Sequence, residues 1–191
     1  MLHNHEKTKF SHISFVTMSS LLVPFAFTRL MYFRDIALYY PNKGYTNAHG
    51  IFLILFILFS ACMTDTFAYF TGSFLGKHKL CPKISPKKTI EGAVGGVLGC
   101  VLANVILYAV YDNFIFENPV HNYLPIVVAS IITSIVGMCG DLTASLIKRN
   151  YGIKDFGNLI PGHGGIMDRF DSIMFVSAAF YAVFNIFEVS V

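Results

Sequence analysis

Carboxylates and glycines come together in one stretch of this sequence, residues 154–171, which reads KDFGNLIPGHGGIMDRFD. Two of its acids, Asp168 and Asp171, stand three residues apart at the start of an apolar run. Carboxylates are ligands for Mg²⁺, and glycines let backbone N–H groups approach a phosphate closely. The stretch therefore predicts a site that binds a phosphate ester together with Mg²⁺. One of the two acids has the alternative role of complementing the positive end of the following helix.

A histidine and two glycines, His163, Gly164 and Gly165, form the turn that precedes these acids. The backbone amides of such a turn are expected to contact phosphate. The imidazole has several alternative roles, as a metal ligand, a base, a phosphate donor or a group that bonds to the backbone, and we assign it no proton transfer.

Acids in two other apolar runs are predicted to belong to the same site. An ionisable group at membrane depth is costly, so Asp65 and Asp141 are functional hypotheses by default. On a helix, Ser145 and Lys148 follow Asp141 at i+4 and i+7 and share its face. Asp141 and Asp168, from different helices, are the predicted magnesium ligands. The alternative for Asp65 and Asp141 is that each caps a helix or pairs with a neighbouring lysine.

The basic segment of residues 76–96 has the composition of a phosphate-binding loop. Two ammonium groups and two hydroxyls surround a proline that is expected to fix a turn, and these four residues are Ser85, Lys87, Lys88 and Thr89. Membrane topology alone would also explain the lysines. Topology does not require the glycines that follow, whose four-residue spacing predicts close packing against another helix.

The elements that would position these residues are membrane-spanning helices. Of the 191 residues, 54% are hydrophobic and 13% are charged, whereas soluble domains carry about 25% charge. A helix needs about 20 apolar residues to cross the bilayer. Five runs of that length predict an all-α, polytopic helical bundle in a single membrane domain, residues 1–191. The runs cover residues 13–33, 48–71, 91–111, 124–147 and 170–190.

Basic residues are distributed unequally between the two ends of this predicted bundle. The N-terminal tail holds two Lys or Arg, residues 72–90 hold five and residues 148–169 hold four, whereas the opposite loops hold only Arg34 and Lys43. Cytoplasmic loops keep such an excess. We therefore expect the N-terminus and the site on the cytoplasmic side of the inner membrane. The basic surface suits anionic lipid headgroups or nucleotides, and no nucleic-acid partner is expected.

Standard nucleotide and protease motifs do not occur in the sequence, which contains no Walker A motif, no GxGxxG and no HExxH. Phosphate binding must therefore use another framework. The signature of CDP-diacylglycerol synthases, also called phosphatidate cytidylyltransferases, resembles this sequence at each of its constrained positions. Those positions are Ser145, Lys148, Arg149, Lys154, Asp155, Gly157, Ile160, Pro161, His163, Gly164, Gly165, Asp168, Arg169 and Asp171. Residues 65–77 and 85–92 are similar to the same family, so the resemblance spans residues 60–185.

The resemblance implies an enzyme that transfers CMP from CTP to phosphatidic acid and releases pyrophosphate. It implies Mg²⁺ held by Asp141 and Asp168, K⁺ as a companion ion in some members, and a homodimer. Joined to the chemistry above, it defines a catalytic and a substrate-binding set. The catalytic set is Asp141, Asp168, Lys148, Ser145, Arg169 and Asp171. The substrate-binding set is Ser85, Lys87, Lys88, Thr89, Asp65, Arg149, Lys154, Asp155, His163, Gly164 and Gly165.

Two rival functions make different predictions. A CTP-dependent polyprenol or phytol kinase would release CDP rather than pyrophosphate. A transporter or non-enzymatic membrane protein would use the buried acids to carry ions, which leaves the His-Gly-Gly turn unexplained. Enzymes of the resembling family are typically longer and have additional N-terminal transmembrane helices, so we expect a short form that retains the catalytic half.

Overall fold

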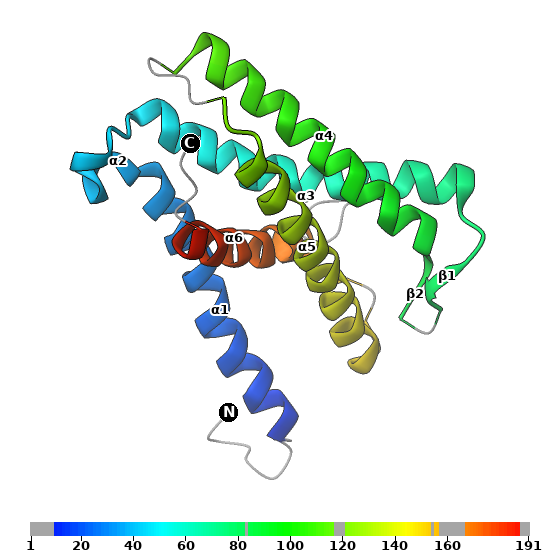
Figure 1. Cartoon of the computed structure of the whole chain (residues 1–191). Helices are drawn as coiled ribbons and strands as arrows, with labels where there is room; N and C mark the ends of the chain where they lie inside the picture. Colours follow the sequence, from blue (N-terminus) through cyan, green and yellow to red (C-terminus); the bar gives the residue numbers. More distant parts are fainter. Residues whose placement is uncertain (1–9, 83, 117–120, 154, 157–166, 188–191) are drawn as a thin grey trace.

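The computed structural model describes the backbone of residues 10–82, 84–116, 121–153, 155–156 and 167–187, and their side chains except at positions 10–15, 18, 167–169 and 187. Five long helices and several short elements follow one another along the chain (Figure 1). They are α1 (Phe10–Arg34), α2 (Ile36–Tyr39), the 3-10 helix η2 (Pro41–Lys43), α3 (Asn47–Leu75), β1 (Lys79–Cys81), β2 (Ser85–Thr89), α4 (Ile90–Phe114), α5 (Leu124–Asn150) and α6 (Met167–Phe187).

The predicted all-α bundle is confirmed, because each of the five predicted crossings overlaps one of the long helices. Within the described residues, α3, α4 and α5 are long and apolar enough to cross a membrane, and α6 contributes a shorter apolar segment, Phe170–Ile186. Helices satisfy their own backbone hydrogen bonds, which is what a lipid environment demands. The chain is therefore a multi-pass membrane protein.

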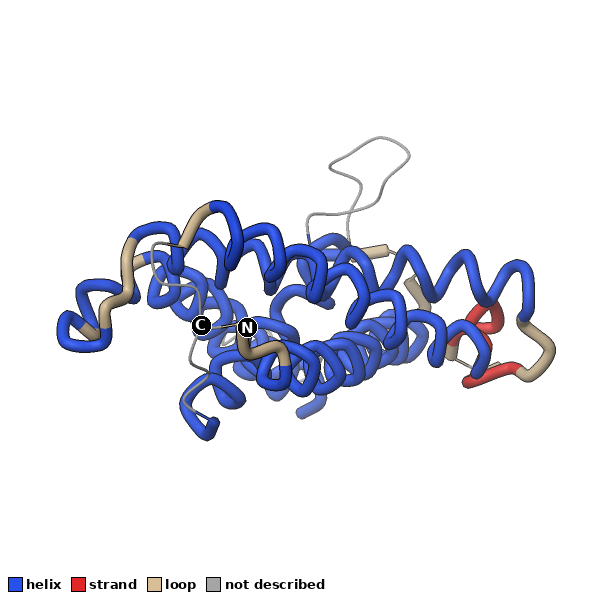
Figure 2. The backbone as a smooth tube through the Cα atoms, turned by 45° about the horizontal axis from the view of Figure 1, so that its top comes forward, coloured by secondary structure: helices blue, strands red, loops and turns tan. Residues whose placement is uncertain are grey.

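Helix α3 is the centre of the bundle, and it lies alongside α4 along much of its length (Figures 1 and 2). Helix α5 packs against α3, α4 and α6, and α1 packs against α6 and α3. Aromatic rings fill the core between α1, α3 and α6. The Phe180 ring lies 4.7 Å from that of Phe56 and 5.1 Å from that of Phe33, centroid to centroid.

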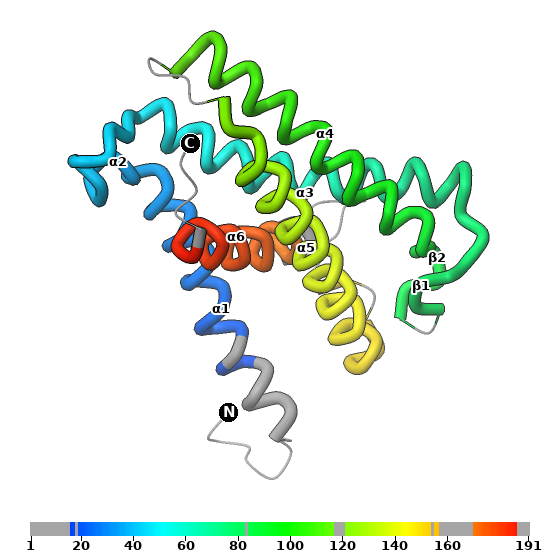
Figure 3. Tube along the Cα trace, viewed as in Figure 1, coloured from blue at the N-terminus to red at the C-terminus, as the bar shows by residue number. Residues whose placement is uncertain are grey.

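The ends of the bundle differ in what they carry. At one end, the Tyr45 ring lies 6.3 Å from that of Phe184, and His49 stacks on Phe116 at 4.2 Å. These contacts join the α1–α3 connection, the end of α4 and the end of α6. The β hairpin lies at the opposite end (Figure 3). The connections that the sequence assigns to one side of the membrane therefore meet at one end of the bundle.

The hairpin corrects the expectation of a loop with a turn at Pro86. Strands β1 and β2 pair antiparallel, with Lys79 opposite Thr89 and Cys81 opposite Ser85. The Ile84 N–H donates to the Cys81 carbonyl at 3.1 Å, so the chain reverses before Pro86. A proline is tolerated inside β2 because this two-stranded sheet consists of edge strands, which need not donate every N–H.

Neutral polar side chains join α3, α4 and α5 in the middle of the bundle. The Asn104 amide nitrogen donates to the hydroxyls of Ser60 at 2.8 Å and Ser130 at 3.1 Å, and the Thr64 hydroxyl donates to Ser134 at 2.9 Å. All five side chains are buried. Interhelical hydrogen bonds of this kind hold membrane helices together. We call these five residues the neutral cluster.

Candidate active site

A cavity of about 550 Å³ opens at the hairpin end of the bundle, between α3, α4, α5 and the two strands. Its polar lining consists of Asp65, Tyr69, Ser73, Lys79, Ser85, Lys87, Lys88, Thr89 and Asp141, and its other lining residues are Ala68, Gly72, Leu80, Gly92, Ala93 and Met138. The cavity thus unites six of the residues that sequence patterns predicted for the site, drawn from three separate segments. They are Asp65, Ser85, Lys87, Lys88, Thr89 and Asp141.

The hairpin brings its lysines to the acids of the helices. The Lys88 ammonium group forms an ion pair with Asp141 Oδ2, and the two side chains are 27% and 25% exposed. Partial burial makes such a pair stronger than one in bulk water. Asp141 therefore does pair with a lysine, as the alternative reading held. That lysine is remote in sequence, however, and lines the same cavity, so the pair belongs to the candidate site.

Carboxylates of two other helices lie within electrostatic reach of Asp65. Asp65 of α3 interacts with Asp141 of α5, Asp171 of α6 and the Lys88 ammonium group. Ser172 lies close to Asp65, and it donates its backbone N–H to Asp171 Oδ1 at 2.7 Å, with its hydroxyl 3.5 Å from the same oxygen. The start of α6 therefore brings Asp171 near Asp65, and the predicted roles of Asp168 and Asp171 stay predictions.

Glycines form one wall of the cavity and allow α3 and α4 to approach closely. A Cβ atom on Gly92 would lie 2.7 Å from the Ala68 carbonyl oxygen, and one on Gly96 would lie 2.9 Å from the Thr64 carbonyl oxygen. The obstructing atoms belong to the α3 backbone and cannot rotate away. The prediction of close packing from the four-residue glycine spacing is therefore confirmed.

Thr89 has a structural role that sequence patterns did not assign. Its side-chain oxygen accepts a hydrogen bond from the Gly92 N–H at 3.1 Å and caps the start of α4. Such a cap satisfies a backbone donor that the helix leaves without a partner. The residue is buried, with 5% of its surface exposed. Thr89 consequently fixes the junction between β2 and α4 as well as lining the cavity.

Residues further along α5 do not line the cavity in the part of the chain that the structure describes. Ser145 and Lys148 follow Asp141 on α5, as predicted, and Arg149 is exposed near the helix end. The Lys148 ammonium group lies 5.3 Å from the centre of the Phe156 ring. Asp155 is also exposed. Their predicted roles toward substrate therefore stay predictions.

Several predicted site residues lie outside the described residues. They are Lys154, His163, Gly164 and Gly165. Asp168 and Arg169 lie on the first turn of α6, but their side chains are outside the described part of the structure. Helices α5 and α6, which carry Asp141 and Asp168, pack against each other, and the predicted pairing of the two acids stays a prediction.

Three site residues were missed by sequence patterns. Lys79 lines the cavity from β1. It belongs to the same basic segment as Lys87 and Lys88, so the basic composition of that segment could have identified it as a site residue. Ser172 donates to Asp171, which it directly follows, and lies close to Asp65. Met138 lines the cavity one turn before Asp141, at i−3 on α5, where helical spacing could have placed it.

The donor set fits a magnesium ion in its chemistry. Mg²⁺ prefers oxygen ligands and is usually held by one or two carboxylates plus substrate phosphates. Within the described residues, no group of three or more His, Cys, Asp or Glu side chains forms a metal cage. A site completed by phosphate does not need such a cage. The acids of α3, α5 and α6 can supply the carboxylates, and lysines that line the cavity can bind the phosphates, so the residues present match that kind of site.

Comparisons with known proteins agree with this chemistry. The sequence profile described as Cytidylyltransferase family matches residues 1–187. The phosphatidate cytidylyltransferase of Staphylococcus epidermidis (strain RP62A) is 44% identical over 131 residues, which cover 69% of this chain and 48% of that protein. The phosphatidate cytidylyltransferase of Bacillus subtilis (strain 168) is 35% identical over 180 residues, or 94% of this chain and 61% of that protein. The chain thus spans 48% to 61% of the length of these two curated relatives.

Proposed function

The chain belongs to the cytidylyltransferase family, and on that premise we propose that it transfers CMP from CTP to phosphatidate. The products are CDP-diacylglycerol and pyrophosphate. The observation that carries the proposal is the cavity at one end of the bundle, where hairpin lysines meet acids of the helices. A water-soluble nucleotide and a lipid held in the bilayer can meet at such a place. The names of the relatives support the same reaction.

The reaction joins two polyanions. A phosphate oxygen of phosphatidate attacks the α-phosphorus of CTP, and the bond from that phosphorus to the oxygen shared with the β-phosphate breaks. Pyrophosphate leaves with the electron pair of that bond. The attacking phosphate is already anionic at neutral pH, so the reaction needs little help from a general base. Positioning and charge neutralisation are therefore the main tasks of the site.

The hairpin supplies the cations for the nucleotide. Lys87 and Lys88 bind oxygens of the triphosphate, and Ser85 donates its hydroxyl. Lys88 contacts Asp141 directly, so a triphosphate that binds beside this acid meets the ammonium group at the same place. Lys79, which also lines the cavity, adds a third positive charge.

Asp141 and Asp168 would hold Mg²⁺, with Asp65 and Asp171 completing the acidic surroundings. When bound, the ion neutralises charge on the triphosphate and favours departure of pyrophosphate. We also propose K⁺ as a companion ion, as in some members of the family. Asp141 and Lys88 orient each other, so that the acid presents an oxygen to the cavity in a fixed direction.

Basic residues at the end of α5 and the start of α6 bind the lipid phosphate and the leaving group. Lys148, Arg149 and Arg169 neutralise the phosphatidate headgroup or the departing pyrophosphate. The remaining members of the two predicted sets complete the walls around the two phosphates, with the backbone amides of the glycine-rich turn as phosphate donors. These residues are Ser145, Lys154, Asp155, His163, Gly164 and Gly165.

The proposed setting is the inner membrane of a bacterial cell, with the hairpin and the N-terminus on the cytoplasmic side. The excess of Lys and Arg in the segments around the cavity supports this orientation. The bacterial sources of the relatives support a bacterial membrane. We further propose a homodimer. An apolar stripe on the exposed face of α4 is available for lipid or for a second copy, and it consists of Ile90, Val94, Leu98, Leu102, Ile106 and Val110.

The test is an assay of the purified chain in phosphatidate-containing vesicles with Mg²⁺ and CTP labelled at the α-phosphate. We expect label in the lipid fraction and release of one pyrophosphate for each labelled lipid. Release of CDP without label in the lipid would identify a lipid kinase instead. Vesicles in which phosphatidate is replaced by phosphatidylglycerol serve as the matched control, and they should give neither product.

A further inference from the structure

We propose that Glu91 is a positioning residue for the CTP site, because its carboxylate fastens the start of the hairpin to α4. The inference rests on the proposed function in one respect, namely that the hairpin lysines bind the triphosphate. Glu91 does not itself line the cavity in the described part of the chain. It would therefore act through the hairpin rather than on the substrate.

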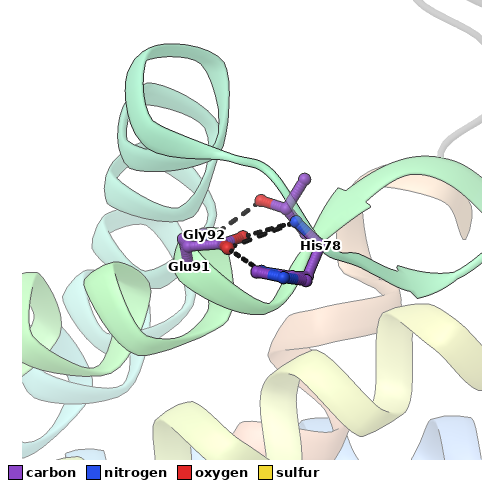
Figure 4. A network of polar contacts seen from close by, with 4 residues as sticks. His78, Glu91 and Gly92 are labelled. Carbon is purple, nitrogen blue, oxygen red and sulfur yellow. Dashed lines mark hydrogen bonds and ion pairs between the residues drawn. The ribbon is translucent and has the colours of Figure 1, made fainter.

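The contacts of Glu91 converge on one residue (Figure 4). The backbone N–H of His78 lies 3.2 Å from both carboxylate oxygens of Glu91, and His78 Nδ1 lies 2.6 Å from Glu91 Oε1. Hydrogen bonds to a charged acceptor are stronger than those between neutral groups. One carboxylate thus binds both the main chain and the side chain of His78.

The position of His78 explains why this contact matters. His78 directly precedes β1, and its carbonyl accepts a hydrogen bond from the Ile90 N–H at 2.9 Å. At the other strand, Thr89 ends β2 and caps α4. The two strands are therefore fastened to the first turn of α4 at neighbouring points, and on the β1 side the Glu91 carboxylate adds its contacts to the backbone hydrogen bond between Ile90 and His78.

A hairpin of this size needs such an anchor. A two-stranded sheet is marginally stable by itself in water, and β1 and β2 contain three and five residues. This hairpin also carries Lys79, Lys87 and Lys88, which repel one another at close range. Binding a triphosphate requires these cations at fixed positions, so a hairpin held at one strand alone would bind CTP more weakly.

A simpler role for Glu91 is to complement the positive end of α4, since it lies in the first turn of that helix. The two roles differ in what they require of His78. A helix-end charge acts without His78, whereas the anchor depends on the donors of that residue. Variants of both partners therefore separate them.

The experiment compares Glu91→Ala, Glu91→Gln, His78→Ala and His78→Asn in the vesicle assay. We expect Glu91→Ala to raise the KM for CTP about tenfold, in line with loss of a charge-assisted hydrogen bond, while kcat and the KM for phosphatidate change little. Glu91→Gln and His78→Ala should have smaller effects, because each keeps part of the contact. His78→Asn should recover the CTP affinity lost in His78→Ala, since its amide nitrogen can replace the ring donor.

The matched control is Asp35→Ala, which removes an acid paired with Arg34 at 2.8 Å near the opposite end of the bundle. It should leave all three kinetic constants unchanged. An unchanged KM for CTP in Glu91→Ala would overturn the proposal. So would equal effects of Glu91→Ala and Glu91→Gln with no effect of either His78 variant, because that pattern identifies a helix-end charge.

Hydrogen exchange of the hairpin amides gives a readout that does not depend on turnover. If Glu91 anchors the hairpin, Glu91→Ala should speed exchange at the amides of residues 78–81, and Asp35→Ala should not. Equal exchange in wild type and Glu91→Ala would overturn the anchor. Absence of product from the wild-type chain would instead overturn the proposed function, and the exchange result would still decide the role of Glu91.

Discussion

Two polar groups of side chains both draw residues from the helices α3 and α5, and they differ in the kind of polar residue that they contain. The neutral cluster of Ser60, Thr64, Asn104, Ser130 and Ser134 is buried and hydrogen bonded across the helices. The charged group of the cavity contains Asp65, Asp141 and Lys88. Thr64 and Asp65 are adjacent in sequence, yet they belong to different groups because successive helical residues point about 100° apart.

This difference indicates that neutral and charged side chains have separate roles in the bundle. A hydrogen bond between neutral side chains in a membrane protein contributes about 0.6 kcal/mol on average, so the neutral cluster adds modest stability. Charged groups in an apolar bundle are far more costly and are retained where they carry function. The neutral cluster should therefore govern stability, and the charged group should govern activity.

The largest effect is expected at Asp141. Asp141→Asn should lower kcat by at least about 100-fold, the usual scale for loss of a key electrostatic group, while the protein still inserts and folds. Activity in the vesicle assay and the melting temperature in detergent measure the two quantities. Asp35→Asn is the control, since it neutralises an acid remote from the cavity. Near-normal turnover in Asp141→Asn would remove this acid from the site.

A substitution in the glycine wall of the cavity should affect both stability and activity. Gly92→Ala places a Cβ 2.7 Å from the Ala68 carbonyl oxygen and 3.1 Å from the Gly72 Cα, so α3 and α4 must separate. Overpacking of this kind costs about 1–3 kcal/mol. We expect a lower melting temperature and reduced activity, whereas Ile51→Ala at an exposed position of α3 should have little effect. A stable and fully active Gly92→Ala protein would show that the close approach is dispensable.

Substitution of Lys87 tests whether the hairpin lysines bind the nucleotide. Its side chain is exposed and lines the cavity, so Lys87→Ala should leave stability unchanged. The KM for CTP should rise about tenfold, which corresponds to ~1.4 kcal/mol of binding free energy. Lys43→Ala, at the other end of the bundle, is the matched control. If the KM for CTP does not move, the lysines of this segment serve membrane topology alone.

The smallest effect is expected in the neutral cluster. Asn104→Ala removes the amide that donates to Ser60 and Ser130, and it should cost about 1 kcal/mol of stability. Thermal unfolding in detergent measures this loss. Activity per folded molecule should be unchanged at a temperature well below the transition. A specific loss of kcat without a loss of stability would break the division between the two groups.

Sequence patterns located the helices well because long apolar runs have few alternatives in a membrane. The glycine spacing of residues 92–99 likewise predicted that this segment packs closely against another helix, which is α3. The hairpin was not predicted, since its residues are charged and include Pro86, features that are also typical of loops. The pairing of Lys88 with Asp141 was not predictable either, because no periodic pattern links residues in two segments that meet only when the bundle folds.

The most direct test of the account is an experimental structure of the chain with CTP and Mg²⁺ bound. The account predicts a triphosphate in the cavity between the hairpin and α5, with Lys87 and Lys88 within hydrogen-bonding distance of its oxygens and the metal on Asp141 and Asp168. A nucleotide bound away from this cavity, or a metal without either acid among its ligands, would contradict it.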